Sequence, residues 1–205
     1  MTDSKLGEFA RLIEDWPGLV SGPPMALIED SLVVLDHMAE ARTVVDVGSG
    51  GGLPGFALKI SRPDLQVTVI EADQAKAAFL VQTAARLGLR GVEVVPRRAE
   101  DAARDPNYRE AFDVATARAL APMRVLVELC LPFVRVGGRL LAQKTAGEDV
   151  VGARHAIEVL GGSLESVVTA PSAAREQGTI IIVDKIASTP DAYPRRAGVP
   201  SRRPL

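Results

Sequence analysis

Short apolar runs alternate along most of the chain with longer stretches in which apolar residues recur every three or four positions. Runs rich in Val and Ile predict buried strands, and the longer spacing predicts amphipathic helices. The predicted strands are residues 43–47, 66–70, 92–96, 113–117, 138–143, 165–169 and 178–186. The predicted helices are residues 6–13, 25–38, 54–61, 74–88, 122–131 and 148–160.

Strands that alternate with helices are typical of a mainly parallel sheet covered on both faces. We therefore expect an α/β fold with a seven-stranded sheet and a small helical extension in front of it. Short linkers leave no room for a second domain, so residues 1–205 are expected to form one domain. Its parts are a helical extension (1–40), the sheet-containing core (41–187) and a basic tail rich in Pro and Arg (188–205).

A glycine-rich segment follows the first predicted strand and reads V-V-D-V-G-S-G-G-G-L-P-G over residues 44–55. Glycine lacks the Cβ that keeps a ligand away from the main chain, and the start of the next helix offers free N–H groups. The second strand ends at Glu71, where an acid accepts hydrogen bonds from ribose hydroxyls in nucleotide-binding folds. The pattern predicts a nucleotide-like ligand held against the main chain.

Two classes of cofactor compete for this segment. Residues 50–55 satisfy G-x-G-x-x-G, the dinucleotide fingerprint, whereas residues 46–52 satisfy D-x-G-x-G-x-G, the methyltransferase version. A carboxylate at Asp46 is favourable beside the cationic sulfonium and amino-acid end of S-adenosylmethionine, and unfavourable beside a pyrophosphate. The sequence favours S-adenosylmethionine, and a dinucleotide-dependent oxidoreductase remains the alternative.

The ligand of such a sheet lies at the carboxyl ends of the strands, so residues just past each strand are the candidates. The ends of the first three predicted strands suit a cofactor, and the ends of the fourth and fifth suit a substrate. The cofactor candidates from these residues are Asp46, Gly48, Gly50, Gly52, Leu53, Glu71, Ala99 and Glu100, and the substrate candidates are Arg118 and Lys144.

Composition narrows the class of protein. The 205 residues are 47% hydrophobic and 24% charged, which is ordinary for a soluble globular domain. Cys130 is the only cysteine, so no disulfide within the chain is possible and we expect no metal site. We see no secretory signal and no apolar stretch of about 20 residues, so we expect a cytoplasmic protein without a membrane partner. Separately, we expect a monomer.

The net charge of −2 does not by itself indicate a nucleic-acid-binding protein. The tail is different, because after Asp191 it carries four arginines and no acid: Arg195, Arg196, Arg202 and Arg203. Two interpretations remain open, a solvated chain end and an arm that contacts phosphates.

Taken in order, these motifs resemble those of the glucose-inhibited division B family of small-subunit ribosomal RNA guanine-N7 methyltransferases. The matching pieces are D-V-G-S-G-G-G-L-P-G at 46–55, Lys76-x-x-Phe79-Leu80, Arg98-Ala99-Glu100, Ala117-Arg118-Ala119, the region of Lys144, and the ending from Tyr193 to Leu205. The front end departs from the family pattern. Asp30-Ser31-Leu32 is present, but Ala26-Leu27 stand where the family has Arg-His, and its Asn-Leu-Thr element is missing.

The resemblance implies a class I, Rossmann-like methyltransferase that moves a methyl group from S-adenosylmethionine to N7 of a guanine in 16S ribosomal RNA or the small subunit. It implies cofactor-binding roles for Gly48, Leu53, Ala99, Glu100 and Arg118, and adds weight to RNA binding by the tail arginines. Guanine N7 has a lone pair and no proton, so the reaction needs positioning rather than a general base. We accordingly predict no catalytic acid or base, and we predict that Arg118 and Lys144 position the substrate. A cofactor-binding module without turnover, and a methyltransferase of small molecules or proteins, remain as alternatives.

Overall fold

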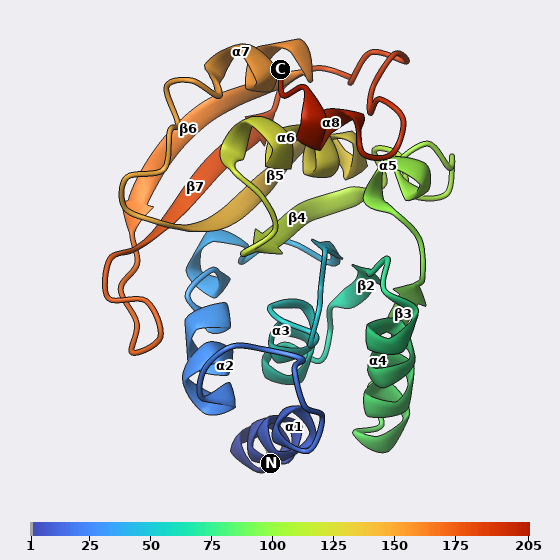
Figure 1. Cartoon of the computed structure of the whole chain (residues 1–205), viewed down its shortest axis with the longest axis vertical. Coiled ribbons are helices and arrows are strands. Elements are labelled where there is room, and N and C mark those ends of the chain that lie inside the picture. Colours follow the sequence, from blue (N-terminus) through green and yellow to red (C-terminus); the bar gives the residue numbers. More distant parts are fainter. Residues whose placement is uncertain (1) are drawn as a thin grey trace.

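The computed structural model describes residues 2–205 and contains a seven-stranded sheet in the order β3-β2-β1-β4-β5-β7-β6 (Figure 1). Neighbouring strands from β3 to β5 run parallel, and β7 runs antiparallel to both β5 and β6. The strands are β1 (Thr43–Val47), β2 (Gln66–Ile70), β3 (Val92–Val95), β4 (Phe112–Arg118), β5 (Val134–Thr145), β6 (Gly162–Thr169) and β7 (Gly178–Lys185). The prediction of a seven-stranded, mainly parallel sheet is confirmed.

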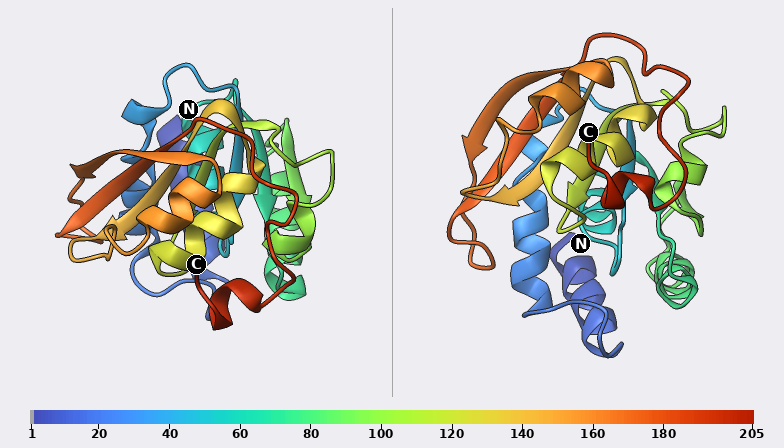
Figure 2. Two further views of the ribbon diagram at one scale, coloured as in Figure 1. Left: turned by 90° about the horizontal axis from the view of Figure 1, so that it is seen from above. Right: turned by 45° about the horizontal axis from the view of Figure 1, so that its top comes forward.

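Helices cover both faces of the sheet (Figure 1). One face packs against α1 (Thr2–Glu14), α2 (Pro24–Leu32), α3 (Gly55–Ser61) and α4 (Gln74–Arg86). The other packs against α5 (Ala99–Ala102), α6 (Met123–Cys130) and α7 (Arg154–Val159). A last short helix, α8 (Val199–Arg202), lies beside α6 (Figure 2). Single 3₁₀ turns occupy Leu35–His37 and Leu131–Phe133.

Side chains of each strand alternate between the two apolar cores, as the pleat requires. On β4, Ala115 and Ala117 belong to the core beneath α6, and Val114 belongs to the core beneath α2 and α3. Arg118 has the same parity as Val114, so it leaves the sheet on the side of α2. The Arg118 side chain therefore contacts residues on that side of the sheet.

Several boundaries differ from the sequence prediction. The helix predicted over 25–38 ends at Leu32, and the helix predicted over 148–160 begins only at Arg154. Asp149 accepts a hydrogen bond from the Gly152 amide (2.8 Å), which stabilises a turn in place of the first turns of that predicted helix. The four-residue helices α5 and α8 are too short to show an apolar period, so the sequence pattern does not predict them.

The C-terminal tail folds back onto α6. Glu128 of α6 is completely buried, and it accepts hydrogen bonds from the main-chain N (2.8 Å) and the Nε (2.9 Å) of Arg195. Arg109 donates to the carbonyls of Thr189 (2.7 Å) and Tyr193 (2.9 Å), which fixes the start of the tail. Arg195 therefore neutralises a buried carboxylate, which argues against its predicted role as an RNA contact.

Among the described residues, no helix combines the length and the apolar composition needed to cross a bilayer.

Candidate active site

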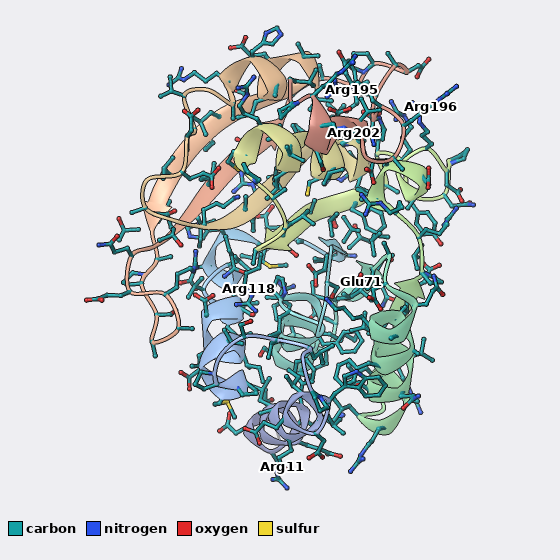
Figure 3. All side chains as sticks on the ribbon, viewed as in Figure 1. Arg11, Glu71, Arg118, Arg195, Arg196 and Arg202 are labelled. Atoms are coloured by element: carbon teal, nitrogen blue, oxygen red, sulfur yellow. The ribbon has the colours of Figure 1, made fainter. Side chains whose placement is uncertain are left out.

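A cavity of about 510 Å³ opens at the carboxyl ends of β1, β2 and β4. Its wall brings together most of the predicted cofactor residues: Gly48, Gly50, Leu53, Glu71, Ala99, Glu100 and Arg118. Figure 3 shows Arg118 on the side of α2 and Glu71 on the side of α4. The sequence prediction that these strand ends meet holds in the structure, while Asp46 and Gly52 lie behind the wall of the cavity.

Asp46 holds the glycine loop from behind. It is completely buried, and its Oδ2 accepts hydrogen bonds from the Ser49 hydroxyl (2.6 Å) and from the Gly55 amide at the start of α3 (2.9 Å). Burial raises the pKa of Asp46 to about 6, and the bonds from Ser49 and Gly55 oppose that rise. The carboxylate thus ties the end of β1 to the first turn of α3, and the loop between them takes its shape from that tie.

Two glycines of the loop leave space for apolar side chains. A Cβ on Gly51 would lie 2.9 Å from Val20 Cγ1 and 3.1 Å from Leu19 Cγ. A Cβ on Gly52 would lie 3.1 Å from the Phe56 ring and 3.2 Å from Leu80 Cδ2. A methyl group at either position would require these side chains to shift, and Gly52 also has φ +87°, so both glycines suit the packing independently of any ligand.

Glu71 is bound to the loop by main-chain hydrogen bonds. Its Oε2 accepts from the Gly50 amide (2.8 Å) and its Oε1 accepts from the Asp73 amide (2.8 Å). Each carboxylate oxygen can accept a second bond. The side chain is therefore fixed in place, at the edge of the cavity, with acceptor capacity left for a hydroxyl.

Glu100 connects the cavity to the tail. It is 1% exposed, and its Oε1 accepts from the Gly198 amide (2.8 Å) and from Arg98 Nη2 (3.2 Å). Burial disfavours its charge, but the bonds from Gly198 and Arg98 outweigh that cost and hold its pKa below the usual range. The tail therefore helps to fix the position of a side chain that lines the cavity.

Arg118 and Lys144, the two predicted substrate residues, do not lie together in this cavity. Arg118 lines both this cavity and a second one, and burial lowers the pKa of its guanidinium against the opposing carboxylates of Asp30 and Asp46. Lys144 lines only the second cavity, where it donates to the Ala121 carbonyl and pairs with Glu148 (3.1 Å).

The sequence prediction missed the contribution of the N-terminal extension to the cavity. The segment 18–21 and Leu27 line it, and Leu19 and Val20 lie against Gly51 of the glycine loop. The pattern Trp16-Pro17-Gly18 indicates only a helix break. The apolar pair Leu19-Val20 directly after that break is the signal that the segment packs onto something.

Comparison with known proteins identifies the family. The family described as GidB, rRNA small subunit methyltransferase G, matches residues 25–177. The proteins named ribosomal RNA small subunit methyltransferase G in Moorella thermoacetica and Roseiflexus castenholzii are 47% and 48% identical to this chain. These matches cover 80% and 79% of this chain and 70% of each relative. The chain belongs to the rRNA small subunit methyltransferase G family.

Solved structures show the same fold at lower identity. The O-methyltransferase TomG from Streptomyces achromogenes, solved with S-adenosylmethionine, has a TM-score of 0.61 at 19% identity, covering 90% of this chain and 91% of its own. A mutant of MtNAS in complex with S-adenosylmethionine has a TM-score of 0.60 at 21% identity, covering 90% and 73%. This member of the rRNA small subunit methyltransferase G family is an S-adenosylmethionine-dependent methyltransferase with a class I fold, as predicted.

A methyl group added at Gly50 tests the role of the loop. Gly50 has φ +55° and lines the cavity, and the nearest atom to a Cβ added there would be the Gly48 carbonyl oxygen at 4.0 Å. In Gly50→Ala the new methyl enters the space of the cofactor, so we expect affinity for S-adenosylmethionine, measured by calorimetry, to fall at least about tenfold.

Gly88→Ala is the matched control. Gly88 has φ +60°, has no atom within 4 Å of an added Cβ, and does not line the cavity. Both substitutions should lower the free energy of unfolding by a similar amount, about 1 kcal/mol. Equal affinities of the two variants for S-adenosylmethionine would contradict the assignment of the loop.

Proposed function

We propose that this enzyme transfers the methyl group of S-adenosylmethionine to N7 of a guanine in 16S ribosomal RNA. Methylation of small-subunit ribosomal RNA follows from the family, and the choice of atom is the step proposed here. The observation that carries it is the lack of a histidine or cysteine base: among residues 2–205, neither cavity at the strand ends includes a His or Cys in its lining.

Each acidic side chain that lines the two cavities has at least one hydrogen-bond or ion-pair partner. Glu71 and Glu100 accept main-chain hydrogen bonds, Glu148 pairs with Lys144, and Asp30 is paired with Arg175 (3.0 Å). An amino or hydroxyl acceptor would need a group that takes up its proton. Guanine N7 needs none, because its lone pair attacks the methyl carbon while the bond from that carbon to sulfur breaks.

The protein then contributes position and electrostatics. When bound, the cofactor supplies the methyl group, and the positive charge of its sulfonium passes to the purine. We assign the main chain around Gly48 and Gly50, with Leu53, to cofactor binding. We assign Glu71 to the ribose hydroxyls of the cofactor, and the start of α5 at Ala99 and Glu100 to its adenine.

Arg118 stands at the junction of the two cavities, which suits a group that contacts both reactants. Asp46 and Gly52 support the cofactor through the shape of the loop.

The exposed arginines of the tail are proposed to contact RNA phosphates. Arg196, Arg202 and Arg203 are exposed, and Figure 3 shows Arg196 and Arg202 at the same end of the molecule. Arg195 is excluded from this set because Glu128 holds it. The anchoring of the tail means that these charges have a fixed position relative to the active site.

The decisive experiment locates the methyl group. Small subunits from a strain that lacks this enzyme are incubated with the enzyme and labelled S-adenosylmethionine. The RNA is then reduced with borohydride and cleaved with aniline, which cuts at 7-methylguanosine. We expect stoichiometric label in one guanosine and one new cleavage site in 16S RNA. Label without aniline cleavage would overturn the N7 assignment, and absence of label would overturn the proposed substrate.

Salt dependence of RNA binding tests the tail. Each phosphate contact that is lost lowers the slope of log affinity against log salt by about 0.7–0.9. We expect the double variant Arg202→Ala/Arg203→Ala to bind RNA more weakly and to show a slope reduced by about 1–2 in a filter-binding titration.

Arg11→Ala is the control for that titration, because Arg11 is exposed on α1 at the opposite end of the molecule (Figure 3). Its slope should equal that of the wild type. A double variant with an unchanged slope would count against phosphate contacts by the tail.

A further inference from the structure

A second cavity of about 410 Å³ adjoins the cofactor cavity and shares Arg118 and Ala119 with it. Its other polar lining residues are Asp30, Gln143, Lys144, Thr145, Glu148 and Arg175. It lies at the ends of β4 and β5, beyond the region assigned to the cofactor. An acceptor placed there would meet the cofactor at Arg118.

Long-range contacts bring these side chains together. Arg118 on β4 and Gln143 on β5 are register partners, so they leave the same face of the sheet, towards α2. Gln143 Nε2 donates to the main-chain carbonyl of Asp30 on α2 (2.6 Å). The Asp30 Oδ1 accepts from the Ser172 hydroxyl (2.7 Å) and from Arg175 Nε (3.1 Å), both in the β6–β7 connection.

Buried polar atoms without a partner gather at this cavity. Among residues 2–205, seven buried side-chain nitrogen or oxygen atoms have no hydrogen-bond partner, and four of them belong to residues of its lining. Two are acceptors, Asp30 Oδ2 and Gln143 Oε1, and two are donors, Arg118 Nε and Arg175 Nη2. Two of the four take part in ion pairs without a hydrogen bond: Asp30 Oδ2 lies 3.6 Å from Arg118 Nη1, and Arg175 Nη2 lies 3.0 Å from Asp30 Oδ1. Asp30 and Gln143 are 1% and 2% exposed, so their two acceptors have no hydrogen bond to solvent. Buried polar atoms are normally hydrogen-bonded, so this cluster is suited to bind polar groups of a ligand.

We propose that this cavity binds the acceptor guanine, with Asp30 and Gln143 accepting hydrogen bonds from its N1–H and N2 amino groups. This inference rests on the proposed function and names residues that select the base. Guanine carries these two donors side by side on its Watson–Crick edge, with O6 between N1 and N7. Arg118 donates to O6, and N7 then lies on the side of the cofactor cavity.

This arrangement excludes adenine. Adenine has an acceptor at N1 and no amino group at C2, so both buried acceptors of the enzyme would stay unpaired, which is a strong basis for rejection. The carboxylate of Asp30 also acts on the reaction itself. Methylation of N7 puts a positive charge on the purine and makes N1–H a stronger donor, so the bond to Asp30 strengthens as the methyl group is transferred. Arg175 and Ser172 act as positioning residues, because they hold the other oxygen of that carboxylate.

Inosine provides the test, because it differs from guanosine only in lacking the N2 amino group. Small-subunit RNA is assembled with guanosine or inosine at the methylated position, and single-turnover methyl transfer is measured on both. We expect the wild type to prefer guanosine by about 10- to 100-fold. Inosine methylated as fast as guanosine by the wild type would overturn the inference without any variant.

Two variants then assign these contacts to residues. Gln143→Met should methylate guanosine more slowly, and its preference for guanosine over inosine should fall to less than about threefold. Asp30→Asn should slow methylation of guanosine and inosine by a similar factor, because both bases carry N1–H, and it should keep the preference for guanosine. Their affinity for S-adenosylmethionine should stay within about twofold of the wild type, which also shows that they are folded. Ser172→Ala is the control, because it removes one hydrogen bond to Asp30 Oδ1 and leaves both acceptors for the base in place.

The outcomes separate this inference from the proposed function. A wild type that leaves N7 of every guanosine unmethylated contradicts the proposed function. A wild type that methylates N7, with a Gln143→Met variant that keeps its full preference for guanosine or an Asp30→Asn variant that methylates both bases at the wild-type rate, contradicts only the base-binding role of that residue. A Ser172→Ala variant that loses the preference as fully as Gln143→Met would assign a merely structural role to the cluster.

Discussion

The buried carboxylate of Asp46 is the constraint on which the active site depends. One of its oxygens accepts from both Ser49 and Gly55, so a single atom closes the glycine loop between β1 and α3. The cost of burying that carboxylate is visible in its raised pKa of about 6. That cost is offset by the order it gives to a loop whose glycines would otherwise leave the main chain free to adopt many conformations. Glu71, which follows β2, then accepts a hydrogen bond from Gly50 and so fixes the loop relative to that strand.

The alternation of side chains along each strand determines which face of the sheet each residue of the site occupies. Asp46 and Arg118 leave β1 and β4 on the face covered by α2 and α3, and Gln143 leaves β5 on the same face. Arg118 lines both cavities, and its position there is set by its place at the end of β4 rather than by a flexible loop. Parts distant in sequence support the cavities: α2 and the β6–β7 connection hold Asp30 and Arg175, and the tail holds Glu100 through a hydrogen bond from Gly198.

Local signals in the sequence are sufficient for the sheet, the glycine loop and the strand ends, because apolar runs and glycine spacing report directly on buried strands and tight turns. They are insufficient where a residue owes its role to a distant partner. In the sequence Glu128 only interrupts an apolar run, and the charge of Arg195 gives no sign that this carboxylate holds it. Arg175 and its contact with Asp30 depend on how a hairpin folds over the sheet, which no local pattern encodes.

The most direct test of the account compares S-adenosylmethionine binding by Asp46→Asn and Asp46→Leu in calorimetric titrations. Both hydrogen bonds of Asp46 end on the same oxygen, so the amide oxygen of Asn can accept both, whereas Leu of similar size can accept neither. If Asp46 acts by holding the loop, Asn should bind within about threefold of the wild type and Leu at least about tenfold more weakly. Full affinity in the Leu variant, or equal losses in both, would contradict the claim that this oxygen shapes the cofactor site.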